Sequence, residues 1–200
     1  QCGYDSIPSD LGTLFAINAL REQCKGAGKP ESPIRKVTCY QMGVGGIGGG
    51  RLQTVIDYSE TPAALAGDFD PKDPFLVGGE PAGGVRQEDG LMTKAFFDNA
   101  LDTWIGPFSM SEVNRRIVHR SNMQLGYGPQ FSESIEQGRL PKSGEGPPAE
   151  ERANRRFQST LIAVNEAGDD IAVGVTGGDA SFEETAKMVI QTGLALVFDS

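Results

Sequence analysis

A glycine-rich stretch at residues 43–50, GVGGIGGG, places Gly43, Gly45 and Gly48 at the spacing of a dinucleotide-binding fingerprint. In that fingerprint the loop joins a strand to a helix, and a later strand brings an acidic residue to the ribose. Here the predicted helix is followed by ETPAALAGDFDPKDP, which is typical of a loop. The pattern favours a helix that begins close to a neighbouring backbone. An anion site at that helix N-terminus is the alternative.

A second group of chemically competent side chains surrounds one predicted helix start. Asp5, Ser6, Ser9 and Asp10 lie within six residues of one another. These residue types cap helices, because their oxygens accept from the unpaired N–H groups of the first turn. They also suit a ligand site, if the segment leaves a nucleotide-binding sheet. Both interpretations remain open.

A basic cluster on a later predicted helix stands out in an acidic chain. Arg115, Arg116, His119 and Arg120 lie close together, and Arg116 and Arg120 share a helix face because they are four residues apart. Guanidinium groups so placed could hold a carboxylate, a phosphate or a carrier-linked acyl group. The alternative is a solvated face with surface salt bridges.

Composition excludes several classes of function. The 200 residues are 38% apolar and 22% charged with a net charge of -9, which indicates a globular chain and argues against nucleic-acid binding. Three scattered cysteines and one histidine predict neither a metal site nor a disulfide framework, so a reducing compartment is expected. No apolar run reaches the roughly 18 residues of a membrane span.

Local patterns predict the elements that must position these residues. Helices are expected at 8–22, from a capping box of Ser109 and Glu112, and from a second box of Ser181 and Glu184. Strands are expected at 34–42, within 101–108, and as a hairpin over 156–176 that turns at 166–169. Residues 59–92 are expected to form a long surface excursion. Strands and helices mix without strict alternation, which predicts an α+β fold.

The final predicted helix is apolar in nearly every direction from residue 188 to residue 198. Such a helix needs cover on all sides. The chain also lacks an initiator Met and stops soon after this helix. We therefore expect a segment truncated at both ends, with an open apolar face along 188–198 when it is isolated, and association or aggregation in solution.

Several motifs resemble one family of oxidoreductases. CGYDSIPSDLG at 2–12, GGIGGGRLQTV, FSMSEVNRRIVHRSNMQLGYGP, GEGPPAEERANRRF and GGDASFEETAKMV are similar to segments of the saccharopine dehydrogenase-like family, which includes trans-acting enoyl reductases. The resemblance covers most of residues 1–198 and is weakest at 59–92. One departure is that Ala180, Ser181 and Phe182 replace the usual Pro-Gly-Tyr.

The resemblance implies a domain arrangement. Residues 1–24 would leave an N-terminal Rossmann domain, 25–176 would form a second, substrate-side domain, and 177–200 would return toward the Rossmann domain. The second domain would hold a mixed, largely antiparallel sheet with helices packed on one side, as in a substrate and dimerisation domain. The glycine stretch would then lie in this second domain, away from the pyrophosphate.

The resemblance also implies a site. Gly3, Asp5 and Ser6 are expected on the cofactor side, and Asp10, Arg116 and Arg120 on the substrate side, with no metal and no catalytic residue assigned. NAD(P) would bind the full-length protein and not this segment alone. Expected partners are the Rossmann domain, a small-molecule or acyl substrate and a second copy in a homodimer, with no nucleic acid.

Two functions follow from the resemblance. The first is an NAD(P)-dependent oxidoreductase acting on an apolar or acyl substrate, such as enoyl reduction in lipid metabolism, with this segment inactive by itself. The alternative is a non-enzymatic binding or scaffold protein that keeps the fold, such as a lipid-associated member. A cytoplasmic location is expected, either in solution or peripheral to a membrane or lipid surface.

Overall fold

The computed structural model describes most of the chain. It describes residues 2–42, 57, 73–78, 92–99, 101–128, 130–136 and 149–198. The glycine-rich stretch at 43–50 and most of the expected excursion at 59–92 lie outside these residues, so the predictions for both stay predictions.

A six-stranded sheet forms the centre of the fold. Its spatial order is β2-β3-β4-β1-β5-β6, and β1 and β4 are the one parallel pair among the described strands. The strands are β1 (Ile34–Met42), β2 (Phe96–Asp98), β3 (Thr103–Pro107), β4 (Gln130–Glu136), β5 (Phe157–Asn165) and β6 (Asp170–Gly177). The prediction of a mixed, largely antiparallel sheet in an α+β fold is therefore confirmed.

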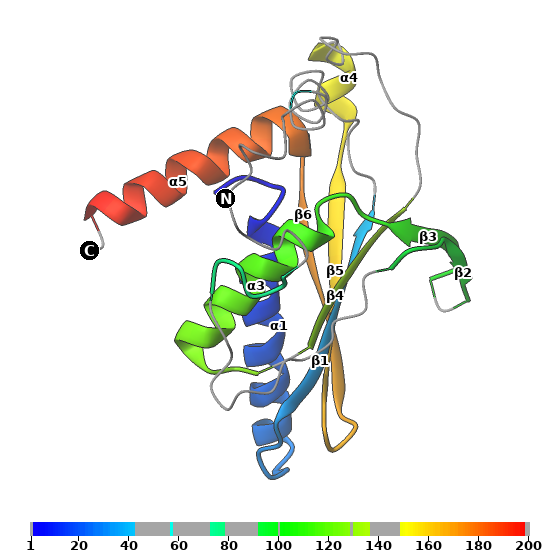
Figure 1. The fold of residues 1–200 in the computed structure, drawn as a ribbon, viewed down its shortest axis with the longest axis vertical. Coiled ribbons are helices and arrows are strands. Elements are labelled where there is room, and N and C mark those ends of the chain that lie inside the picture. Colours follow the sequence, from blue (N-terminus) through cyan, green and yellow to red (C-terminus); the bar gives the residue numbers. More distant parts are fainter. Residues whose placement is uncertain are drawn as a thin grey trace.

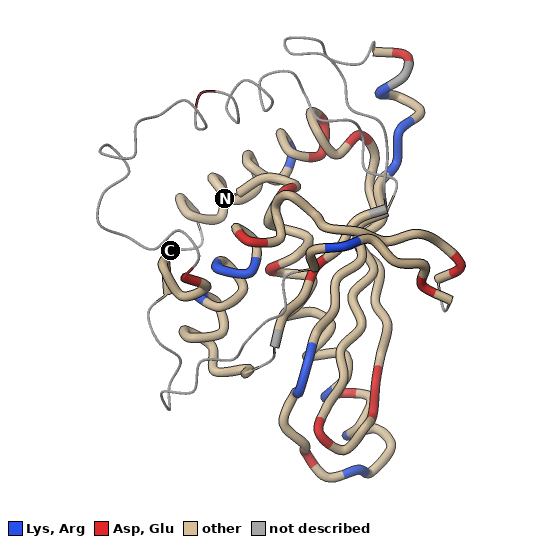
Figure 2. The backbone as a smooth tube through the Cα atoms, turned by 45° about the vertical axis from the view of Figure 1, so that its right-hand side comes forward, with Lys and Arg blue, Asp and Glu red and all other residues tan. Residues whose placement is uncertain are grey.

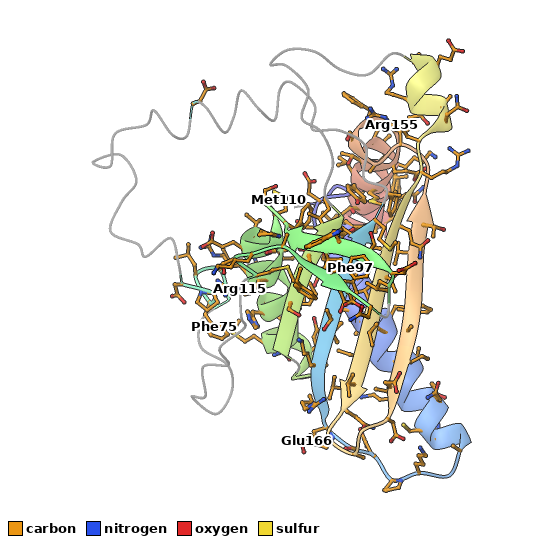
Figure 3. The ribbon with its side chains drawn as sticks, turned by 90° about the vertical axis from the view of Figure 1, so that its right-hand side faces the viewer. Phe75, Phe97, Met110, Arg115, Arg155 and Glu166 are labelled. Atoms are coloured by element: carbon orange, nitrogen blue, oxygen red, sulfur yellow. The ribbon has the colours of Figure 1, made fainter. Side chains whose placement is uncertain are left out.

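Two helices cover one face of this sheet, α1 (Ile7–Gly26) and α3 (Ser111–Leu125), as expected from the sequence (Figure 1). The hairpin of β2 and β3 lies on the other side, where Phe97 projects in front of the sheet (Figure 3). A short helix, α4 (Ala149–Asn154), precedes β5, and a π-helical turn (Ala180–Glu184) leads into α5 (Thr185–Phe198). No described helix is long and apolar enough to cross a membrane.

Strand alternation decides which side chains meet the helices. In β1, Val37, Cys39 and Gln41 are buried while their neighbours are partly exposed, and β5 follows the same two-residue period. The apolar members of these strands pack with Ala16, Ile17 and Leu20 of α1 into one core. A smaller cluster, at the end of the sheet where β5 begins, contains Tyr4, Phe157 and Ala180.

The last helix, α5, extends away from the sheet (Figure 1). None of its residues is buried, and Phe198 is 76% exposed. Exposed apolar side chains follow its whole length: Val189, Ile190, Leu194, Leu196, Val197 and Phe198. The expected open apolar face along residues 188–198 is thus confirmed, whereas the expected association in solution stays a prediction.

The structure corrects both predicted helix starts. Helix α3 begins at Ser111 with Met110 as its N-cap, and Ser109 lies outside the helix. At the second start, Asp179 and not Ser181 is the cap, and its carboxylate accepts from the backbone N–H of Phe182 at 2.8 Å. The first helix thus starts without a side-chain cap, and the second uses a cap residue two positions before the predicted one.

Helix α1 approaches the sheet closely at Gly12. A Cβ built on Gly12 would lie 2.8 Å from Cδ1 of Leu161, which is fully buried in β5. Glycine is therefore required here by the short distance between helix and strand, since a larger residue would push the two apart.

We predict that Gly12→Ala lowers the free energy of unfolding by about 1–3 kcal/mol through overpacking. Gly26→Ala is the matched control on the same helix, because a Cβ there meets nothing within 4 Å. Urea denaturation of both variants measures the effect. Equal stabilities for the two variants would contradict the close approach.

Candidate functional site

A buried carboxyl group lies where both helices begin. Glu133 of β4 is 4% exposed, and its side chain points to the helix-covered face of the sheet. Its Oε1 accepts from the Ser9 hydroxyl at 2.6 Å and from the Gln41 amide at 2.8 Å, and its Oε2 accepts from the Asn114 amide at 2.9 Å. The Cys39 thiol is a fourth hydrogen-bonding neighbour. Every one of these partners is uncharged.

Further hydrogen bonds extend from these partners to the start of α1 and to β5. The Ser6 hydroxyl donates to Oδ1 of Asn114 at 2.9 Å. Gln41 Oε1 accepts from the Ser159 hydroxyl at 2.5 Å and from the Tyr4 hydroxyl at 3.2 Å. We call Tyr4, Ser6, Ser9, Gln41, Asn114, Glu133 and Ser159 the buried polar network. It ties α1, α3, β1, β4 and β5 together at one place.

Burial sets the electrostatics of this network. Removal from water raises the pKa of Glu133, and its hydrogen bonds to Ser9, Gln41 and Asn114 oppose that shift only in part. Burial also raises the pKa of Tyr4, and it raises the pKa of the Cys39 thiol well above its ordinary value. Because these side chains are buried, the network holds the surrounding elements together and is closed to solvent.

The three residues expected on the cofactor side differ in their exposure to solvent. Ser6 is 1% exposed and its hydroxyl is directed to Asn114 in the interior. Gly3 and Asp5 remain partly exposed on the turn before α1. A Cβ on Gly3 would lie 3.0 Å from Cγ2 of Thr185, so α5 begins against this turn. We call residues 3–6 the α1 turn.

The residues expected on the substrate side lie on the two packed helices. Asp10 is partly buried and hydrogen-bonds to Ser121 of α3, and burial raises its pKa. Arg116 donates to the backbone carbonyl of Asp73 at 3.0 Å and pairs with Glu112 at 3.2 Å. Arg120 is exposed on the same helix. Arg116 therefore holds the segment 73–78 against α3, whereas Arg120 faces solvent.

His119, the one histidine in the sequence, is also packed inside the structure. His119 is 3% exposed and its ring lies 4.7 Å, between centroids, from the ring of Phe75. Figure 3 shows Phe75 and Arg115 beside α3. Contact between α3 and the segment 73–78 thus buries the centre of the basic cluster and leaves its end, at Arg120, open.

A cavity of about 470 Å³ lies at the far end of α1, lined by Leu20, Cys24, Ile34 and Lys29 among others. Helix α1 has 20 residues, so this end is about 30 Å from the α1 turn. Lys29 is paired with Asp169, and charges of both signs gather at this end of the molecule (Figure 2). The cavity brings together none of the residues predicted from sequence, so the α1 turn is the stronger candidate site.

Sequence reasoning missed the central members of the buried polar network. Gln41 follows the inward positions of Val37 and Cys39, and Glu133 stands two residues after the buried Phe131. A charged or amide residue at an inward strand position was the available signal. It was not used for Glu133 because strand β4 itself was not predicted.

Comparison with known proteins points to one kind of enzyme. The chain is 25% identical to a protein of Mycobacterium tuberculosis with the provisional name trans-acting enoyl reductase, found in two strains, and 22% identical to a trans-acting enoyl reductase of Mycobacterium ulcerans. Each match covers 99% of this chain and 58% of the relative. No protein-family model matches, and no solved structure is significantly similar.

We predict a pH-dependent stability difference between the wild type and Glu133→Gln. Because the native pKa of Glu133 is raised, the folded protein binds its proton more tightly than the unfolded chain does. The carboxyl thus contributes less to stability as pH rises above about 4.5. Gln does not titrate, so the advantage of the wild type should shrink with rising pH in urea denaturation. An advantage that grows with pH would contradict the raised pKa.

Proposed function

We propose that this chain is the substrate-side part of an NAD(P)-dependent enoyl reductase of lipid metabolism, acting on an acyl chain that a partner protein presents. The supporting observation is that similarity to proteins named trans-acting enoyl reductases extends over 99% of the chain. The match is therefore to the whole fold described above and not to one short motif.

Enoyl reduction adds a hydride to the β-carbon of a 2-enoyl thioester and a proton to its α-carbon. A bound nicotinamide supplies the hydride, and the protein supplies binding, orientation and exclusion of water. In this proposal the α1 turn forms the wall against which the nicotinamide and the enoyl group meet. The hydride chemistry itself belongs to the cofactor.

The α1 turn fits this role in part. Gly3 and Asp5 are partly exposed, so a backbone group and a carboxylate can face a carboxamide or a substrate. Ser6 is turned into the core, so its predicted part is indirect, through Asn114. Tyr4 is 3% exposed and donates to Gln41, which makes it unsuitable as a proton donor to substrate. We therefore assign the cofactor contacts to Gly3 and Asp5.

The two helices beside the turn fit an acyl substrate delivered by another protein. Arg120 is exposed on α3 and can pair with a carboxylate or phosphate of the presenting partner. Leu11 and Phe15, which are 54% and 58% exposed, share a face of α1 four residues apart. Such apolar side chains next to the turn suit an acyl chain.

The exposed apolar residues of α5 support the proposal that a further domain packs on this helix. Its exposed apolar residues are too many for a stable free surface, since covering each Leu, Val or Phe contributes roughly 1.5–3 kcal/mol. The chain spans 58% of the length of its curated relatives. In our proposal a nucleotide-binding Rossmann domain, present in the full-length protein, packs on α5 and brings NAD(P) to the α1 turn.

We predict that the full-length protein oxidises NADPH only when a 2-enoyl thioester is present, and that it forms the saturated thioester. The 200-residue chain alone should neither bind NADPH nor turn over substrate, because the hydride donor would be held by the other domain. Loss of NADPH absorbance and mass spectrometry of the thioester measure the reaction, and calorimetry measures binding. A full-length protein that binds acyl ligands but oxidises neither NADPH nor NADH would instead be a scaffold, and the reductase proposal would fail.

A further inference from the structure

The first turns of α1 and α3 are joined by one side chain. Asn114, fully buried in the first turn of α3, accepts from Ser6 at 2.9 Å and donates to Glu133 at 2.9 Å and to Ser9 at 3.3 Å. Ser6 is the N-cap of α1 and Ser9 lies in its first turn. Asn114 therefore links both helix starts to β4.

These two helix starts carry the two sides of the proposed site. Asp5 on the α1 turn is next to Ser6, and Arg116 is two residues beyond Asn114 on α3. We propose that Asn114 and Glu133 form a positioning pair, which fixes the cofactor side of the site relative to its substrate side. This proposal rests on the proposed function.

The directions of these hydrogen bonds fix the orientation of the Asn114 amide, and with it the register between α1 and α3. The carboxylate of Glu133 only accepts, so the amide nitrogens of Asn114 and Gln41 must both face it. The amide oxygen of Asn114 is then the atom that faces Ser6, and it accepts from that hydroxyl. An apolar contact of the same size would let α1 and α3 slide, whereas these bonds define one register between them.

Exchanging the acid and the amide tests the pair. In Asn114→Asp a second carboxylate faces Oε2 of Glu133, and one of the two must take up a proton. In the double variant Glu133→Gln, Asn114→Asp, the amide oxygen introduced on β4 can accept from Ser9 and Gln41, while the amide nitrogen beside it donates to the carboxylate introduced on α3. The other oxygen of that carboxylate still accepts from Ser6. The Ser9 oxygen loses the amide of Asn114 as a donor and keeps that of Gln41, and the other hydrogen-bond directions are restored with the charge moved from β4 to α3.

The pH profile should report the pair specifically. Among the described residues, the titratable groups near Glu133 are the Cys39 thiol on β1 and the Tyr4 phenol before α1. The uncharged Ser9, Asn114 and Gln41 hydrogen-bond to it from α1, α3 and β1. From β5, the uncharged Ser159 reaches the network through Gln41. Burial raises the pKa of both Cys39 and Tyr4, so neither ionises at neutral pH. A pH dependence that Asn114→Asp introduces therefore belongs to the two carboxyl groups.

The experiment measures kcat and KM of the full-length protein for NADPH and a 2-enoyl thioester across pH, per folded molecule. For Asn114→Asp we expect kcat/KM to fall at least about tenfold at neutral pH, since a misplacement of about 1 Å at a reacting group can cost ~100-fold. The loss should be smaller at acid pH. The double variant should recover to within about threefold of the wild type and should lose the added pH dependence.

Asn165→Asp is the matched control at the far end of the molecule. Asn165 is 2% exposed and donates to the carboxylate of Asp169 at 3.0 Å, so this variant also sets an acid against an acid. It should lose stability with rising pH and keep kcat and KM per folded molecule.

Each outcome separates the two proposals. A wild type without turnover with either NADPH or NADH overturns the proposed function, and the positioning role with it. An active wild type with Asn114→Asp unchanged per folded molecule overturns the positioning role alone. If Asn114→Asp does not fold, the double variant decides, because failure to recover activity in a folded double variant also overturns the pairing.

Discussion

The fold depends on keeping one carboxyl group hydrogen-bonded in the absence of water. Glu133 points into the layer between sheet and helices, where an unpaired acid would be strongly destabilising. Ser9, Gln41 and Asn114 supply the donors that water would otherwise supply, and they come from three different elements. The helices and strands can therefore meet in one arrangement only, because any other leaves buried donors or acceptors unsatisfied.

This constraint divides the molecule into a fixed interior and a surface open to partners. The polar network and the apolar core beside it hold α1 and α3 on one face of the sheet. Outside that layer lie the α1 turn, the exposed end of α3 and the apolar length of α5, which begins against Gly3 through Thr185. The proposed cofactor and domain contacts fall on this outer set, and the proposed acyl contacts Leu11 and Phe15 lie on the exposed face of α1.

Sequence patterns predicted the parts of the fold that local rules govern. The strand 34–42 and the hairpin after residue 156 have strong two-residue alternation, and the structure confirms both. Strand β4 was missed because its inward positions combine Phe131 with Glu133, and an acid at a core position weakens the alternation. Asn114 gave no local signal, and the inward amide of Gln41 marked one buried polar position without its partners, which come together only when five elements meet. The predicted caps failed because α3 starts at Met110 without a side-chain cap, and because Asp179, two residues before Ser181, is an equally good cap residue.

The most direct test of this account is a titration of the Glu133 carboxyl by carbon NMR in the wild-type protein. We expect a midpoint above about 4.5, the ordinary value, because burial raises the pKa of this group. The backbone amides of Ser9 and Asn114 should shift with the same midpoint, since both side chains hydrogen-bond to the carboxylate. A midpoint at the ordinary value, with those amides unmoved, would show that Glu133 is solvated and does not hold α1 and α3 together.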